Sequence, residues 1–184
     1  MGKWALLVGL CAASYSISAS AAEIARISVA KHGDVFIAEA EFVIDVPRDA
    51  AVELLTSFDR LYELNPAVIA SQAQALPGGS YRVTTRVRDC VAFFCRSVGM
   101  VEDISIDGQS SVHAEIIPEL SDFESGTTTW QFVDHGPETR IVYRSQVKPK
   151  FWLPPLLGSH AIQNALQRQI RATAINLESM SRNP

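Results

Sequence analysis

The sequence predicts an α+β fold in which a curved, seven-stranded antiparallel sheet wraps around one long C-terminal helix, with two short helices after the first strand. Three observations lead to this prediction. Residues 35–46 alternate between apolar and polar side chains, the period of a half-buried strand. The same period returns from residue 68 to 147, broken by turns short enough for an antiparallel meander. After Pro154 and Pro155 the period becomes that of an amphipathic helix reaching about Met180.

Local patterns place each element in turn. Pro47 ends the first strand, residues 48–58 carry apolar side chains at helical spacing, and residues 59–65 form a second short helix that Pro66 stops. Six strands should follow near residues 68–76, 80–89, 96–106, 111–117, 127–133 and 139–147. The apolar stripe of the last helix is Ile162, Leu166, Ile170, Thr173 and Leu177. The helix should therefore pack one face on the sheet.

Composition bounds the function. The chain has 184 residues, of which 47% are hydrophobic and 20% charged, so it can bury a core and is neither disordered nor a polytopic membrane protein. Its net charge of −4, without a basic cluster, excludes duplex binding, and no nucleic acid is expected as a partner. The sequence has no phosphate-binding loop or nucleophile elbow. Metal-ligand spacing is missing among the histidines, which are His32, His113, His135 and His160. We therefore expect no metal or cofactor.

The first residues have the pattern of a secretory signal peptide. One positive charge at Lys3 precedes a short apolar stretch, and small residues end at Ala21. The stretch is too short to span a bilayer, and the bulky Leu10 before Cys11 fits a lipoprotein site poorly. We expect residues 1–21 to be removed and residues 22–184 to form one exported domain, periplasmic if the source is Gram-negative.

Cys90 and Cys95 are then the only cysteines left, and an oxidising compartment favours their pairing. Five residues of extended chain span ~16 Å, which is beyond the reach of a disulfide. The two can bond only if the residues between them turn back as a hairpin tip. The alternative is two separate thiols in a strand. A redox role is not favoured, because no helix N-terminus lowers the pKa of either thiol.

Apolar side chains are expected to gather at one end of the sheet. Alternate connections of a meander lie on the same side, which groups the 90–95 tip, the 118–126 loop and the 148–155 segment. Their large side chains are Phe93, Phe94, Phe123, Phe151, Trp152, Leu153, Leu156 and Leu157. An apolar patch on an exported monomer would serve as a cavity lid, a membrane-docking surface or a partner interface. The other interpretation is that these side chains fold inward and plug the core.

The alternation of inward and outward side chains along the strands predicts an interior with room for a ligand. Several inward positions are small or weakly polar: Ala38, Ala40, Thr85, Ala114, Thr128 and Ser145. The candidate ligand contacts on inward positions are Tyr81, Thr85, Met100, Trp130 and Tyr143, and those at the apolar end are Phe93, Phe94, Phe123, Phe151 and Trp152. Glu102 is unusual, because a buried carboxylate needs a partner or a raised pKa. A bulge that shifts the register is the first explanation, ahead of a ligand anchor or an acid/base group.

The sequence resembles the START / Bet v 1-like (SRPBCC, polyketide cyclase/dehydrase) superfamily over about residues 35–180. The segment 43–66 is similar to its opening strand–helix–helix pattern, in Asp45, Pro47, Phe58, Tyr62 and Pro66 among others. The remainder looks like an exported bacterial branch of the superfamily, on the cysteine pair, Ser121-Asp122-Phe123 with Gly126 and Trp130, and Phe151-Trp152 with Pro154 to Gly158. The resemblance implies a helix-grip fold with a deep cavity for lipids, sterols, quinones or polyketides.

We therefore expect a monomer that binds, and in some settings transports, a lipid or other hydrophobic small molecule, with peripheral membrane contact through its apolar loops. The sequence favours a binding protein over an enzyme. The first alternative is a cyclase or dehydratase-type enzyme with Glu102 and Asp122 as acid/base candidates. The second alternative is an interaction module that uses the apolar end.

Overall fold

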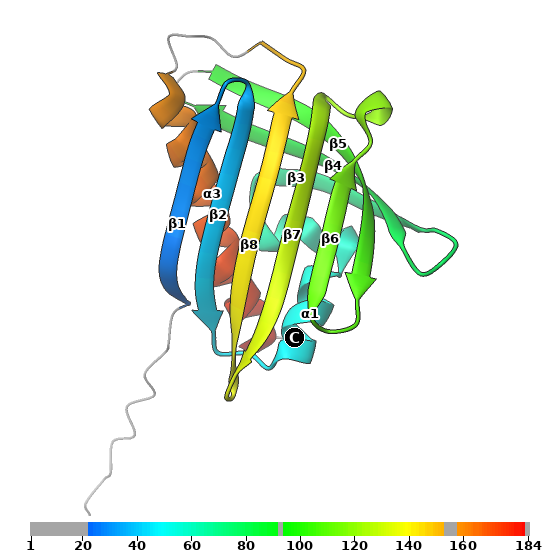
Figure 1. Cartoon of the computed structure of the whole chain (residues 1–184), viewed down its shortest axis with the longest axis vertical. Coiled ribbons are helices and arrows are strands. Elements are labelled where there is room, and N and C mark those ends of the chain that lie inside the picture. Colours follow the sequence, from blue (N-terminus) through cyan, green and yellow to red (C-terminus); the bar gives the residue numbers. More distant parts are fainter. Residues whose placement is uncertain (1–21, 92–93, 153–157, 183–184) are drawn as a thin grey trace, which may run out of the picture.

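The computed structural model describes residues 22–91, 94–152 and 158–182. Within them, eight strands form one antiparallel sheet in the order β1-β2-β8-β7-β6-β5-β4-β3 (Figure 1). Their bounds are Glu23–His32 (β1), Val35–Ile44 (β2), Val68–Ala75 (β3), Tyr81–Val91 (β4), Phe94–Asp107 (β5), Ser111–Ile116 (β6), Phe123–His135 (β7) and Glu138–Pro149 (β8). The α+β class and the antiparallel sheet around a C-terminal helix are confirmed, but the sheet has one strand more than the seven predicted.

The additional strand is β1, which pairs with β2 across a tight turn at Gly33. Gly33 has φ +60°, a conformation that glycine adopts at little cost. A bulge between Ile24 and Arg26 breaks the alternation of apolar and polar residues along β1. For that reason the period-two pattern of the sequence becomes clear only at β2, and the two short helices follow the second strand instead of the first.

The helices connect and cover the sheet. Helix α1 (Arg48–Leu55), the 3-10 turn η1 (Phe58–Arg60) and helix α2 (Leu61–Leu64) lead from β2 to β3, and η2 (Pro118–Leu120) joins β6 to β7. The long helix α3 (Gly158–Arg182) lies across the concave face of the sheet, where it contacts β1, β2 and β4, and it also meets α1 and α2 (Figure 1). Within the described part of the chain, none of the helices combines the length and apolarity needed to cross a bilayer.

Large side chains pack the interior at the end of the sheet near α1. Phe42, Ile141 and Phe132 stand opposite one another on β2, β8 and β7, and each is at most 3% exposed. Leu55 of α1 and Leu177 of α3 belong to the same buried cluster. Burying a side chain of this size stabilises the fold by roughly 1.5–3 kcal/mol, so this end holds the hydrophobic core.

Two rows further along the same strands, the inward residues become small. Ala38 on β2 stands opposite Ser145 on β8, which stands opposite Thr128 on β7. Side chains of this length leave space between the sheet and α3. The interior is therefore packed at one end and hollow at the other, as the small inward residues in the sequence predict.

Candidate functional site

A cavity of about 320 Å³ lies between the hollow end of the sheet and helix α3. Its volume is at the lower end of the range typical of small-molecule sites. The wall is mostly apolar and is built by β2, β4, β5, β7, β8 and α3. Its apolar side chains include Phe36, Ala38, Val87, Val98, Met100, Val147, Ile162, Ala165, Leu166 and Ile170. Such a wall favours a hydrophobic occupant, because apolar burial contributes about 25 cal/mol per Å².

The structure brings together six of the ten residues that the sequence proposes as ligand contacts. Those on the cavity wall are Phe94, Met100, Phe123, Trp130, Tyr143 and Phe151. Tyr81 lies elsewhere, with its ring 5.3 Å from that of Phe58. Thr85 is buried but does not reach the wall, and its hydroxyl donates a 3.5 Å hydrogen bond to the Met100 carbonyl. Trp152 is 69% exposed and off the wall, while Phe93 lies outside the described residues.

Polar groups are few on the deep part of the wall and are satisfied by one another. The hydroxyls of Thr128 and Ser145 lie 3.0 Å apart, on neighbouring strands. Next to them, the rings of Trp130 and Tyr143 meet at 4.5 Å between centroids and close the cavity toward the core. Burial raises the pKa of the Tyr143 phenol, although its hydrogen bond with Ser145 partly opposes the shift. Tyr143 therefore remains a neutral phenol that can orient a polar group of a bound molecule.

Glu102 corrects one sequence interpretation. The register from β4 through β6 is regular around it, with Glu102 opposite Val83 on one side and Ile116 on the other. No bulge turns the residue outward, and Glu102 is only 8% exposed. Burial raises the pKa of its carboxyl to about 7, and the negative charge of Glu102 contributes to the raised pKa of Tyr143. Glu102 nevertheless does not line the cavity.

Asp122, the other acid/base candidate, fastens a loop. Its carboxylate accepts a 2.7 Å hydrogen bond from the Gly99 amide, and its own amide donates to the Gly99 carbonyl at 2.9 Å. The side chain is exposed and does not line the cavity. This is the local hydrogen bonding by which aspartate commonly closes loops.

Side chains from three separate segments meet where the cavity reaches the surface, and we call this region the mouth. Phe123 and Phe151 pack edge to face with centroids 5.7 Å apart. The Arg96 guanidinium lies over the Phe151 ring, 4.4 Å from its centroid. The Asp89 carboxylate accepts a 2.5 Å hydrogen bond from the Gln169 side chain and so joins β4 to α3. The sequence also predicts four further apolar side chains at this end: Phe93, Leu153, Leu156 and Leu157. These four residues lie outside the described part of the chain.

Asp89, Arg96 and Gln169 line the cavity and were missed from the sequence. Asp89 is two residues from the inward-facing Val87 on β4, and Arg96 is two residues from the inward-facing Val98 on β5. Residues two apart on a strand face the same side, so this alternation is the signal in the sequence that places Asp89 and Arg96 on the inner face. Charged side chains next to a hairpin tip are usually exposed to solvent, which masks this signal for Asp89 and Arg96.

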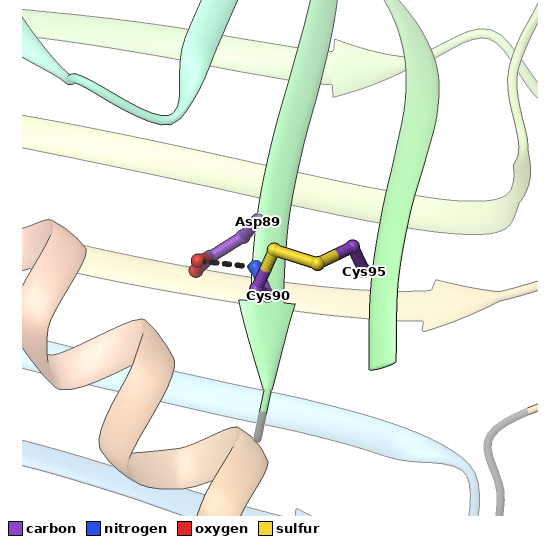
Figure 2. Close-up of a disulfide and its surroundings, with 3 residues drawn as sticks. All are labelled: Asp89, Cys90 and Cys95. Atoms are coloured by element: carbon purple, nitrogen blue, oxygen red, sulfur yellow. Dashed lines mark hydrogen bonds between the residues drawn. A yellow bond between two sulfur atoms is a disulfide. The ribbon is translucent and has the colours of Figure 1, made fainter. Parts of the chain in front are cut away.

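The predicted disulfide joins Cys90 to Cys95 beside the mouth, with 4.0 Å between the two Cα atoms. The cysteines face each other on β4 and β5, directly next to the Asp89 and Arg96 pair. Figure 2 shows the bond bridging the two strands, with the Asp89 carboxylate turned back to accept a 2.7 Å hydrogen bond from the Cys90 amide. Both cysteines are exposed, so the disulfide lies on the outer face while Asp89 and Arg96 line the cavity.

The sheet clasping one long helix over a cavity defines the class: a START / Bet v 1-like, helix-grip protein. Residues 36–180 match the family described as polyketide cyclase / dehydrase and lipid transport, and the chain belongs to that family. Comparison with curated proteins found no match.

Similar solved structures share the fold at low identity. An aromatase/cyclase from Streptomyces sp. R1128 is 12% identical with a TM-score of 0.66, over 80% of this chain and 94% of the other. A START superfamily protein from Mycobacterium smegmatis is 12% identical with a TM-score of 0.63, over 79% and 97%. A STAR-related lipid transfer protein from Xanthomonas axonopodis is 15% identical with a TM-score of 0.60, over 85% and 99%.

Proposed function

We propose that this protein is exported and binds one hydrophobic small molecule or lipid in the cavity between its sheet and α3. The observation that carries the proposal is the row of Ala38, Ser145 and Thr128, which keeps the space under the helix empty of the protein's own side chains. The family description, which includes lipid transport, and the lipid transfer protein among the similar structures support it.

The arrangement fits binding better than cyclase or dehydratase chemistry. An acid or base must come within hydrogen-bond distance of the atoms it serves. Glu102 and Asp122 do not line the cavity, and the Asp122 carboxylate is hydrogen-bonded to the Gly99 amide of β5, so neither faces a molecule in the cavity. Tyr143, Thr128 and Ser145, which carry hydroxyl groups, do line the cavity, and they suit the orientation of a polar group on an otherwise apolar ligand.

Native mass spectrometry of the protein recovered from the exported fraction tests both parts of the proposal. We expect a polypeptide mass without residues 1–21, carrying a noncovalent adduct that organic solvent extracts as a lipid or similar apolar compound. Ala38→Phe should reduce the adduct strongly, because the new ring occupies the row of small residues. Ile37→Phe, which adds the same ring on the other face of the same strand, is the matched control and should retain it.

Three other results would contradict the proposal. Protein found only in the cell extract, at its full-length mass, would overturn export. A wild type that arrives empty, and stays empty when incubated with extracted lipids, would overturn ligand binding. Equal adduct in Ala38→Phe and wild type would place the bound molecule outside this cavity.

A further inference from the structure

We propose that the ligand is an amphiphile with an anionic oxygen headgroup, a carboxylate or a phosphate, which Arg96 binds at the mouth while the apolar tail occupies the cavity. The inference rests on the proposed function and adds the chemical class of the molecule. It starts from the position of Arg96, whose side chain lines a mostly apolar cavity at the point where the cavity meets solvent.

Arg96 has no acidic partner among the residues that the structure describes. Its contact is with the Phe151 ring, which Phe123 holds in turn by edge-to-face packing. Stacking on a ring leaves the edge of the guanidinium, with its N–H donors, free to face a ligand. A planar guanidinium matches the two oxygens of a carboxylate or phosphate, which makes arginine well suited to these groups.

The carboxylate nearest in the sheet is already engaged. Asp89 stands directly opposite Arg96, yet one of its oxygens accepts the Cys90 amide and the other accepts the Gln169 side chain. Asp89 thereby ties the hairpin to α3 and leaves the guanidinium for a ligand. The disulfide lies between this pair and the hairpin tip, and it fixes the separation of the two strands at the mouth.

Exposure of Arg96 makes this arrangement stable without a ligand. A guanidinium that remains in contact with water keeps its hydration, whereas one sealed in an apolar cavity would need a permanent counter-ion. A molecule with its tail in the cavity would place its polar end beside Arg96. A neutral headgroup would accept a weaker hydrogen bond from this residue than an anionic one, so Arg96 favours negative charge.

Equilibrium binding of four probes by the exported, lipid-stripped protein at pH 8 tests the inference. The probes are palmitate, hexadecyl phosphate, hexadecanol as the uncharged analogue, and inorganic phosphate as a headgroup without a tail. We expect at least one of the two anionic amphiphiles to bind about tenfold more tightly than hexadecanol, the effect of a charge-assisted hydrogen bond at a partly solvated site. This preference should shrink as salt is added.

Two variants assign the preference to a residue. Arg96→Gln should abolish the advantage of the anionic probes and its salt dependence while hexadecanol binds as before. Arg88→Gln removes an exposed arginine from the outer face of the same hairpin and should change neither. Palmitate and hexadecyl phosphate together show which headgroup Arg96 accepts better.

Several results would overturn the inference. If hexadecanol binds as tightly as both anions, the headgroup assignment fails and the proposed function stands. If Arg96→Gln weakens all amphiphiles equally, Arg96 supports the structure of the mouth and does not select charge. If inorganic phosphate alone binds as tightly as hexadecyl phosphate, the tail contributes nothing. If no amphiphile binds at all, the proposed function fails too.

Discussion

Glu102 is an ionisable residue that the fold places among apolar neighbours. It faces Val83 and Ile116, which are 0% and 4% exposed, and its carboxyl is buried with them. Removing a charged carboxylate from water is costly, which is why burial raises the pKa of Glu102 to about 7. The folded protein thus retains a proton that the unfolded chain releases at a lower pH.

This difference makes folding stability depend on pH. Below about pH 4.5, Glu102 is protonated in both states and carries no penalty. Between that pH and about 7 the unfolded chain loses the proton first, so stability falls as pH rises, by on the order of 3 kcal/mol in total. Glu102→Gln should therefore raise the free energy of unfolding relative to wild type far more at pH 8 than at pH 5, as measured by urea denaturation.

Glu115→Gln, at an exposed position on the outer face of β6, is the matched control and should shift stability little at either pH. A Glu102→Gln variant whose advantage is the same at pH 5 and pH 8 would show that the carboxyl titrates alike in both states.

At the residue scale, the alternation of inward and outward side chains along each strand was enough to predict which residues face the interior. Parity alone places Trp130 and Tyr143 on the inner face, and both line the cavity. The same parity gave the correct direction for Glu102, but the cost of burying a carboxylate made a register shift look more probable than burial. Tyr81 and Thr85 also face inward, but they do not line the cavity. Which inward residues reach the cavity depends on the path of α3 over the sheet. Local sequence patterns do not determine that path.

At the scale of elements, the β4–β5 hairpin is the most constrained part of the mouth. It carries the disulfide on its outer side and the Asp89–Gln169 link to α3 on its inner side. The disulfide joins two cysteines that are five residues apart in sequence. Closing a loop of this length lowers the entropy of the unfolded chain, which stabilises the folded protein by about 2 kcal/mol.

Replacing Cys90 and Cys95 with serine should lower the free energy of unfolding by about that amount. It should also accelerate amide hydrogen exchange selectively along β4 and β5, measured by mass spectrometry. Wild type reduced with dithiothreitol should behave like the double variant. Unchanged exchange in the hairpin, with exchange elsewhere accelerated, would show that the bond stabilises the fold without holding the mouth.

The strands and helices also differ in how well the sequence predicts them. Strands β2 to β8 were predicted, most of them because one buried face imposes strict alternation. β1 is an edge strand with a bulge, mostly exposed, so little selects for alternation along it. The short helices were expected at the right place, although the first ends at Leu55, three residues before the predicted end.

On the scale of the whole molecule, α3 serves two purposes along its length. Leu177, toward its C-terminal end, is 0% exposed and packs in the core with Phe42 and Leu55. Leu166, eleven residues and three turns earlier on a similar face, is half-buried and lines the cavity. One helix therefore seals the core at one end and covers an empty space at the other, which separates the residues that stabilise the fold from those that would hold the ligand.

This division predicts unequal effects of one substitution at two positions of α3. In lipid-stripped protein, Leu177→Ala should cost about 3 kcal/mol of unfolding free energy, since it opens a void in a close-packed core. Leu166→Ala removes the same atoms from a wall with few neighbours on its inner side, and should cost about 1 kcal/mol or less. Urea denaturation followed by circular dichroism measures both. With ligand bound, the cost of Leu166→Ala should rise, because the contacts that the side chain lacks in the empty protein are then made by the ligand. Equal costs in the stripped protein would mean that the two ends of the helix are packed alike, and the interior would then have no room for a guest.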